Sequence, residues 1–110
     1  MTDRLAKRSG LSRVNGKDVP DKRVMYWFFC PGCKLAHCFQ TGGVETAWSF
    51  NGNMESPSFL PSLVCSGGCS ESRCHLMLTD GKLQFFNDCC HELAGKIVDL
   101  PELPDWVRAQ

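Results

Sequence analysis

The sequence predicts a mostly β, small zinc-stabilised single domain built from a zinc knuckle and β-hairpins. Three observations lead to this fold class. The chain has 110 residues, the length of one domain, and cores of this size often need metals or disulfides for stability. Eight cysteines are available for that purpose, two of them in the turn Cys30-Pro-Gly-Cys33. The apolar runs are of strand length and are bounded by turn residues.

The N-terminal part of the chain is predicted to be a separate segment because of its charge. Residues 1–23 carry seven basic and three acidic side chains, a net charge of +4, whereas residues 74–110 carry a net charge of −3. We therefore expect a flexible basic N-terminal arm at 1–23, followed by the zinc-binding β domain at 24–110. The arm shows no basic helix and no interleaved aromatic residues, so nucleic acid is not expected as a partner.

The first half of the domain is predicted to contain short strands. The β-branched and aromatic run "RVMYWFF" predicts a strand over 23–29, the turn "CPGC" follows, and "LAHCFQ" predicts a second strand over 35–40. Apolar and polar residues alternate in "ETAWSFN" at 45–51, as in a half-buried strand. The segment 56–65 is expected to be extended, because its two prolines forbid a regular helix.

The second half contains the clearest predicted element, a hairpin over 74–87. Asp80-Gly81 lies between two apolar runs and predicts a two-residue turn, with Thr79 facing Lys82. We expect a compact turn at 91–95 and a last strand at 96–100. The tail after that strand is expected to end in a helical turn that packs through its tryptophan, Trp106.

The compartment follows from what the sequence lacks. The N-terminal residues have no apolar segment typical of a signal peptide, and no apolar run approaches the roughly 18 residues of a membrane span. We therefore expect a cytoplasmic protein without a membrane partner. Because the cytoplasm is reducing, cysteine clusters there bind metal more often than they form disulfides.

The cysteine pattern predicts a zinc site. Zn²⁺ prefers four nitrogen or sulfur ligands, and Cys30 and Cys33 at the end of a strand supply two of them. The predicted hairpin brings Cys74 and Cys89 to its open end, and His91 follows two residues later. The sequence therefore predicts Zn²⁺ bound by Cys30, Cys33 and two of Cys74, Cys89 and His91.

Other sulfur and imidazole groups have less certain roles. Cys65 and Cys69 could bind a second metal or pair when oxidised, or lie in a loop with nothing attached. His37 could be a ligand or a solvated strand residue, and Cys38 is expected to be a small core residue or an edge side chain.

A candidate nucleophilic site follows from strand alternation. Successive side chains of a strand point to opposite faces, so His75 should face away from the metal if its neighbour binds it. A histidine there is a candidate general base, and the "PSFLPS" run offers Ser58 and Ser62 as nucleophiles. Asp88 or Glu92 could orient the imidazole, as the third member of a triad does.

The blocks "WSFNGN", "PSFLPS" and "CHLMLTDG" resemble a family of small phage and prophage zinc-knuckle proteins of unknown function. That family is similar to peptidase domains encoded in bacterial ubiquitin-like conjugation operons. The resemblance covers roughly residues 28–101 and implies Ser62 as nucleophile and His75 as base, with Cys30 and Cys33 in the knuckle. This chain departs from the wider pattern in its plain "CPGC" knuckle and in the cysteine directly before His75.

Two functions follow from these features. The first is a small serine peptidase in which Ser62, His75 and Asp88 are catalytic and zinc is structural, acting on a protein substrate. The alternative is a non-catalytic zinc-stabilised module that docks a host or virion protein. A catalytic zinc with Glu92 as base ranks last, because the ligand set is rich in sulfur.

Overall fold

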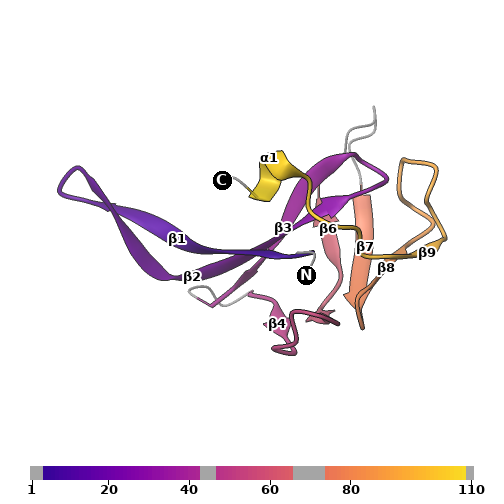
Figure 1. The fold of residues 1–110 in the computed structure, drawn as a ribbon, viewed down its shortest axis with the longest axis horizontal. Helices are drawn as coiled ribbons and strands as arrows, with labels where there is room; N and C mark the ends of the chain where they lie inside the picture. Colours follow the sequence, from indigo (N-terminus) through magenta and orange to yellow (C-terminus); the bar gives the residue numbers. More distant parts are fainter. Residues whose placement is uncertain (1–3, 43–46, 66–73, 109–110) are drawn as a thin grey trace.

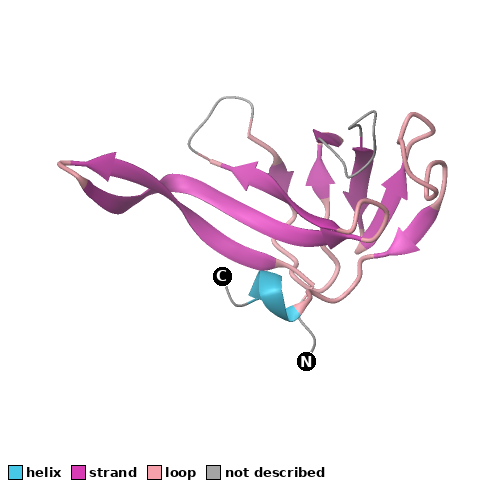
Figure 2. Ribbon diagram, turned by 90° about the horizontal axis from the view of Figure 1, so that it is seen from above, coloured by secondary structure: helices cyan, strands magenta, loops and turns pink. Residues whose placement is uncertain are grey.

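The computed structural model describes residues 4–42, 47–65 and 74–108, without the side chains of Cys65 and Arg108. In these ranges the chain forms nine β-strands and one short helix, arranged as three antiparallel sheets (Figure 1, Figure 2). The prediction of a mostly β fold built from hairpins is therefore confirmed. No helix in the described ranges is long and apolar enough to cross a membrane.

The first sheet has three strands in the order β1 (Ala6–Val14), β2 (Lys17–Cys30) and β3 (Leu35–Thr41). Strands β1 and β2 form a long hairpin that extends away from the rest of the molecule (Figure 1). Its turn is Asn15-Gly16, and both residues have positive φ angles, 52° and 79°. This is the backbone that a tight two-residue hairpin needs, and Asn-Gly favours it strongly.

The long hairpin differs from the flexible arm expected at 1–23. From residue 4 onward this segment is mostly strand, and β2 begins at Lys17 rather than at the predicted residue 23. The side chains of Leu5 and Ala6 are buried. The Asn15-Gly16 turn signal explains the difference, because it pairs the two halves of the basic segment with each other. The division into an arm at 1–23 and a domain at 24–110 stays a prediction.

The sheet that carries the candidate site has the order β6 (Leu63–Cys65), β7 (Cys74–Thr79), β8 (Lys82–Phe85) and β9 (Ile97–Asp99). The predicted hairpin is confirmed: Thr79 pairs with Lys82, and the turn residues Asp80 and Gly81 both have positive φ. The last strand also lies where the sequence predicts it.

Two shorter elements complete the fold. Strands β4 (Ser49–Phe50) and β5 (Phe59–Leu60) form a two-residue ladder, so the strand predicted over 45–51 is short where it is described. Helix α1 (Asp105–Arg108) is the expected helical turn. Trp106 is half exposed and its ring makes a T-shaped contact with that of Phe29, whereas Val107 is the buried residue of α1.

One aromatic core joins the three sheets. The rings of Phe39 and Phe59 stack with centroids 4.2 Å apart, and Phe50 stacks on the other face of Phe59 at 4.6 Å. Cys30 and Cys74 are fully buried and belong to this cluster. The core therefore fixes the end of β2 against the start of β7, which is where the predicted metal ligands lie.

Candidate active site and metal centre

Strand β7 separates two clusters of polar side chains. Cys74 and every second residue after it are buried, whereas His75 and Met77 are only half-buried and face the opposite side. This alternation is the period-two pattern of a strand with one face on the core. Adjacent residues therefore belong to different sites, as the sequence predicts.

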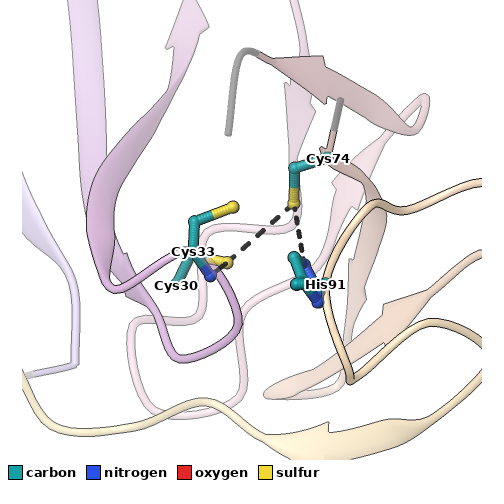
Figure 3. A group of neighbouring side chains, drawn as sticks. All are labelled: Cys30, Cys33, Cys74 and His91. Carbon is teal, nitrogen blue, oxygen red and sulfur yellow. Dashed lines mark hydrogen bonds between the residues drawn. The ribbon is translucent and has the colours of Figure 1, made fainter. Parts of the chain in front are cut away.

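The inner cluster consists of Cys30, Cys33, Cys74 and His91, whose ligand atoms all lie within 4.8 Å of one another (Figure 3). The two sulfur atoms of Cys30 and Cys74 are 3.9 Å apart, and Nε2 of His91 is 3.4 Å from Sγ of Cys74. Three thiols and one imidazole are a donor set that suits a tetrahedral metal ion such as zinc. Of the three residues that could complete the knuckle, Cys74 and His91 are the two that the structure brings to it.

The local backbone makes this cluster possible. The turn after β2 is closed by the N–H of Lys34, which donates to the carbonyl of Cys30 at 2.7 Å. The N–H of Cys33 donates to Sγ of Cys30 at 3.4 Å, which fixes the first thiol against the turn. A Cβ atom on Gly32 would overlap the ring of His91. The imidazole therefore lies against the knuckle only because position 32 has no side chain.

The electrostatics of the inner cluster also suit a cation. The neighbouring thiol of Cys74, together with burial, raises the pKa of Cys30 to about 12. Burial lowers the pKa of His91, which favours the neutral imidazole that binds metals. The raised pKa means that a buried thiolate at Cys30 is unfavourable without a positive charge beside it. A divalent cation bound to the sulfur atoms would supply that charge.

Cys89, the fifth predicted ligand, lies outside the four-atom cluster. Its sulfur atom contacts the main chain of His75 instead, at 3.2 Å from the nitrogen and 3.0 Å from the oxygen. His37 is buried beside Cys30 and Cys33, so its interpretation as a solvated strand residue is wrong. Its Nε2 has no hydrogen-bond partner among the described residues.

The outer cluster is a Ser–His–Asp arrangement. Oγ of Ser62 is 3.0 Å from Nε2 of His75. Nδ1 of the same imidazole is 3.1 Å and 3.2 Å from the two carboxylate oxygens of Asp88. These are the contacts that a serine nucleophile, its base and an orienting carboxylate require. The serine and histidine are partly buried, and the carboxylate is exposed.

The register of the sheet explains how the three side chains meet. His75 pairs directly with Val64 on β6, and its other neighbour is Phe86, whose N–H donates to the carbonyl of His75. Ser62 and Asp88 are each two residues from these direct partners. Ser62 is thus a diagonal neighbour of the histidine on the same face of the sheet. Asp88 instead reaches the imidazole from the turn that follows β8.

The two other candidates from the sequence have different surroundings. Oγ of Ser58 accepts the N–H of Asp80 at 2.8 Å, so this serine holds the β7–β8 turn. Glu92 is exposed and directly follows His91 of the inner cluster in the chain. Of the two serines and two carboxylates considered, Ser62 and Asp88 are therefore the pair that reaches the imidazole.

Trp48 is a site neighbour that sequence reasoning missed. Its indole Nε1–H donates to the carbonyl of Ser62 at 3.4 Å, and its ring meets Phe39 edge-on. The tryptophan thus connects the backbone of the serine to the aromatic core. The alternating pattern around Trp48 shows that it is half-buried, but the pattern alone does not indicate which carbonyl its N–H meets.

The remaining cysteines lie apart from both clusters where they are described. Cys38 is a half-buried free thiol on β3, and burial raises its pKa. Cys90 is disulfide-bonded. Cys69 and the side chain of Cys65 lie outside the described residues, so the prediction of a second metal or a pair there stays a prediction.

Comparison with known proteins gives one family. Residues 3–86 match the family model described as "Bacterial ubiquitination-like system serine protease (BubE)", which is more than half of the chain. The matched range includes Ser62 and His75 and ends two residues before Asp88. No curated protein and no solved structure matches the chain.

Proposed function

The chain belongs to the bacterial ubiquitination-like system serine protease (BubE) family, and from this premise we propose that it is itself a serine peptidase. Ser62 is the nucleophile, His75 the general base and Asp88 the residue that orients the imidazole. The observation that carries the proposal is the continuous chain of contacts from Oγ of Ser62 through both nitrogens of His75 to the carboxylate of Asp88.

The geometry supports acyl transfer in two steps. In the first, Oγ of Ser62 attacks the carbonyl carbon of a peptide bond while Nε2 of His75 takes the hydroxyl proton. The imidazolium then gives this proton to the departing amine nitrogen, which leaves an acyl-enzyme ester. In the second step, water attacks the ester, its proton goes to Nε2, and the carboxylate product leaves as Ser62 regains its proton.

The inner cluster is proposed to be a structural zinc site. Cys30, Cys33, Cys74 and His91 would hold the ion, which supplies cross-linking rather than catalysis. Two features support a structural role. The donor set is complete with four protein ligands, and it faces the core on the opposite side of β7 from Ser62.

The substrate and setting of the enzyme are also proposals. A protein substrate follows from the peptidase chemistry, and a phage or prophage origin from the sequence resemblance. Five described cysteines, including the three thiol ligands, are free, which supports the reducing cytoplasm as the compartment, whereas the disulfide at Cys90 does not. Cell fractionation with a thiol-trapping reagent tests this location.

The nucleophile can be tested without knowing the substrate. A fluorophosphonate reacts with an activated serine: Oγ bonds to phosphorus, fluoride leaves and the histidine takes the proton. We expect the full chain to be labelled at Ser62, and Ser62→Ala to abolish labelling while metal content and melting temperature stay unchanged. Ser58→Ala is the matched control and should keep its labelling, because this serine only accepts a turn N–H.

An unlabelled wild-type protein with full metal content would contradict the peptidase proposal. The non-catalytic docking module would then be the better account, since it needs the same fold and metal but no activated serine. Labelling at Ser58 in place of Ser62 would equally overturn the assignment of the nucleophile.

A further inference from the structure

The pairing of β7 with the chain that follows β8 changes at His75. The N–H of Phe86 donates to the carbonyl of His75 at 3.0 Å, as expected if the antiparallel ladder continued. In a regular ladder the carbonyl of Phe86 would accept the N–H of His75 in return. Instead it accepts the N–H of Cys89 at 3.2 Å, because the chain turns over residues 86–89.

The thiol of Cys89 occupies the place of the missing carbonyl. Its sulfur accepts the N–H of His75 at 3.2 Å and donates to the carbonyl of the same residue at 3.0 Å. Both main-chain groups of His75 on this side are therefore satisfied although β8 has ended. A buried N–H without such a partner would cost stability and leave the strand end free to shift.

The turn next to this thiol places the carboxylate. Asp88 lies inside the turn 86–89, and its oxygens reach Nδ1 of His75. The main-chain N–H of Cys89 thus closes the turn that carries Asp88, and the thiol of the same residue holds the backbone that carries His75. We propose that Cys89 is a positioning residue for the His75–Asp88 pair, a role that rests on the proposed peptidase function.

This role differs from that of a metal ligand, which the sequence pattern first suggested for Cys89. The four ligand atoms of the inner cluster form a complete donor set without it. Both hydrogen bonds of its thiol go to the main chain of His75. The two roles predict opposite results for metal content, so they can be separated by experiment.

The test compares Cys89→Ala and Cys89→Ser in the full chain, with p-nitrophenyl acetate as the probe substrate. We expect Cys89→Ala to lower kcat about tenfold or more, since small misplacements of catalytic groups have effects of that size. KM should change by less than about twofold, because the thiol contacts no substrate. Metal per chain should equal that of the wild type, and the downfield proton resonance of His75 Nδ1–H should weaken.

Cys89→Ser should recover most of kcat, because a hydroxyl can both accept and donate a hydrogen bond. If the alanine variant fails to fold, the kcat and metal content of Cys89→Ser test the positioning role in its place. Cys38→Ala is the control for loss of a half-buried free thiol and should keep wild-type kcat.

Loss of metal in either Cys89 variant would overturn the proposal and return Cys89 to the ligand set. An unchanged kcat in a folded Cys89→Ala variant would overturn it as well. The metal measurement does not depend on activity, and the kcat comparison requires an active wild type. Both outcomes therefore differ from failure of the peptidase proposal, in which the wild type itself is inactive.

Discussion

At the scale of single residues, the candidate metal centre depends on the absence of a side chain at Gly32. Gly32 lies between the two knuckle cysteines, and the ring of His91 occupies the space that a Cβ would fill. His91, the fourth candidate ligand, is far from the knuckle in the sequence. The space at position 32 therefore decides whether its imidazole can reach the three thiols. Position 32 therefore controls the ligand set without binding the ion.

Gly32→Ala should weaken metal binding by about tenfold or more, the size of effect seen when neighbours of metal ligands are changed. The methyl group would push the imidazole of His91 away from the three thiols. Competition with a chromophoric chelator measures the affinity. Gly52→Ala is the control: its Cβ meets nothing within 4 Å, so backbone strain at this positive-φ site should lower stability and leave affinity unchanged. Equal affinities for the two variants would contradict the role of Gly32.

Asp88→Asn should lower the fluorophosphonate labelling rate about a hundredfold, while the fold and the metal content stay intact. An amide cannot stabilise the imidazolium, and it favours the wrong tautomer of His75. Glu92→Gln removes a carboxylate from the same region and should label at the wild-type rate. A variant pair with the opposite order of rates would assign the orienting role to Glu92.

At the scale of elements, turn chemistry decided how much could be predicted. Asp80-Gly81 fixes the β7–β8 register, so the direct pairs of that hairpin follow from sequence alone. The opposite faces of Cys74 and His75 follow from the same strand. The choice among the three possible ligands after the knuckle could not be predicted, because it depends on how the turn after β8 folds back. The β1–β2 hairpin was missed because the basic residues around Asn15-Gly16 suggested a loose tail.

The β1–β2 hairpin has a braced outer part and a buried base. Hydrogen bonds from Arg23 and Ser12 hold the pKa of Asp21 well below its usual range, and Arg23 also donates to the carbonyl of Leu11. These contacts join the two strands of the hairpin to each other and do not involve the other sheets. At the base, Leu5 and Ala6 are buried with the core residues. The two parts should therefore contribute differently to stability.

Shortening the hairpin and removing its base should have different effects on the melting temperature. Replacing residues 11–20 by a two-residue Asn-Gly turn removes only exposed side chains, so the fold and the metal site should persist. Deleting residues 1–22 also removes Leu5 from the core, a loss of about 2–5 kcal/mol. Circular-dichroism melts of the two variants test this. A deletion variant as stable as the full chain would mean that the base of the hairpin is dispensable.

At the scale of the whole molecule, the inner cluster connects the two larger sheets. Cys30 ends β2 in the first sheet, Cys74 begins β7 in the second, and His91 follows β8. An ion held by these residues would cross-link segments that are otherwise joined by the aromatic core. The energy of metal binding should therefore appear as energy of folding.

Removing the metal should lower the melting temperature by more than about 10 °C, since a domain of this size loses several degrees for each kcal/mol. Melts with and without a strong chelator measure the effect, and Cys30→Ser should behave like the chelated protein. Cys38→Ser is the matched control, because its thiol lies outside the cluster. Identical melting curves with and without chelator would show that metal binding at the knuckle does not stabilise the fold.

The opposite orientations of Cys74 and His75 have a consequence for inhibition. A compound that reacts with the serine would approach from the outer face of β7, whereas a chelator would withdraw the ion from the buried face. The two kinds of compound would therefore not compete for the same site. Chelation should therefore appear as non-competitive inhibition that is reversed by adding metal, whereas serine-directed compounds should compete with substrate.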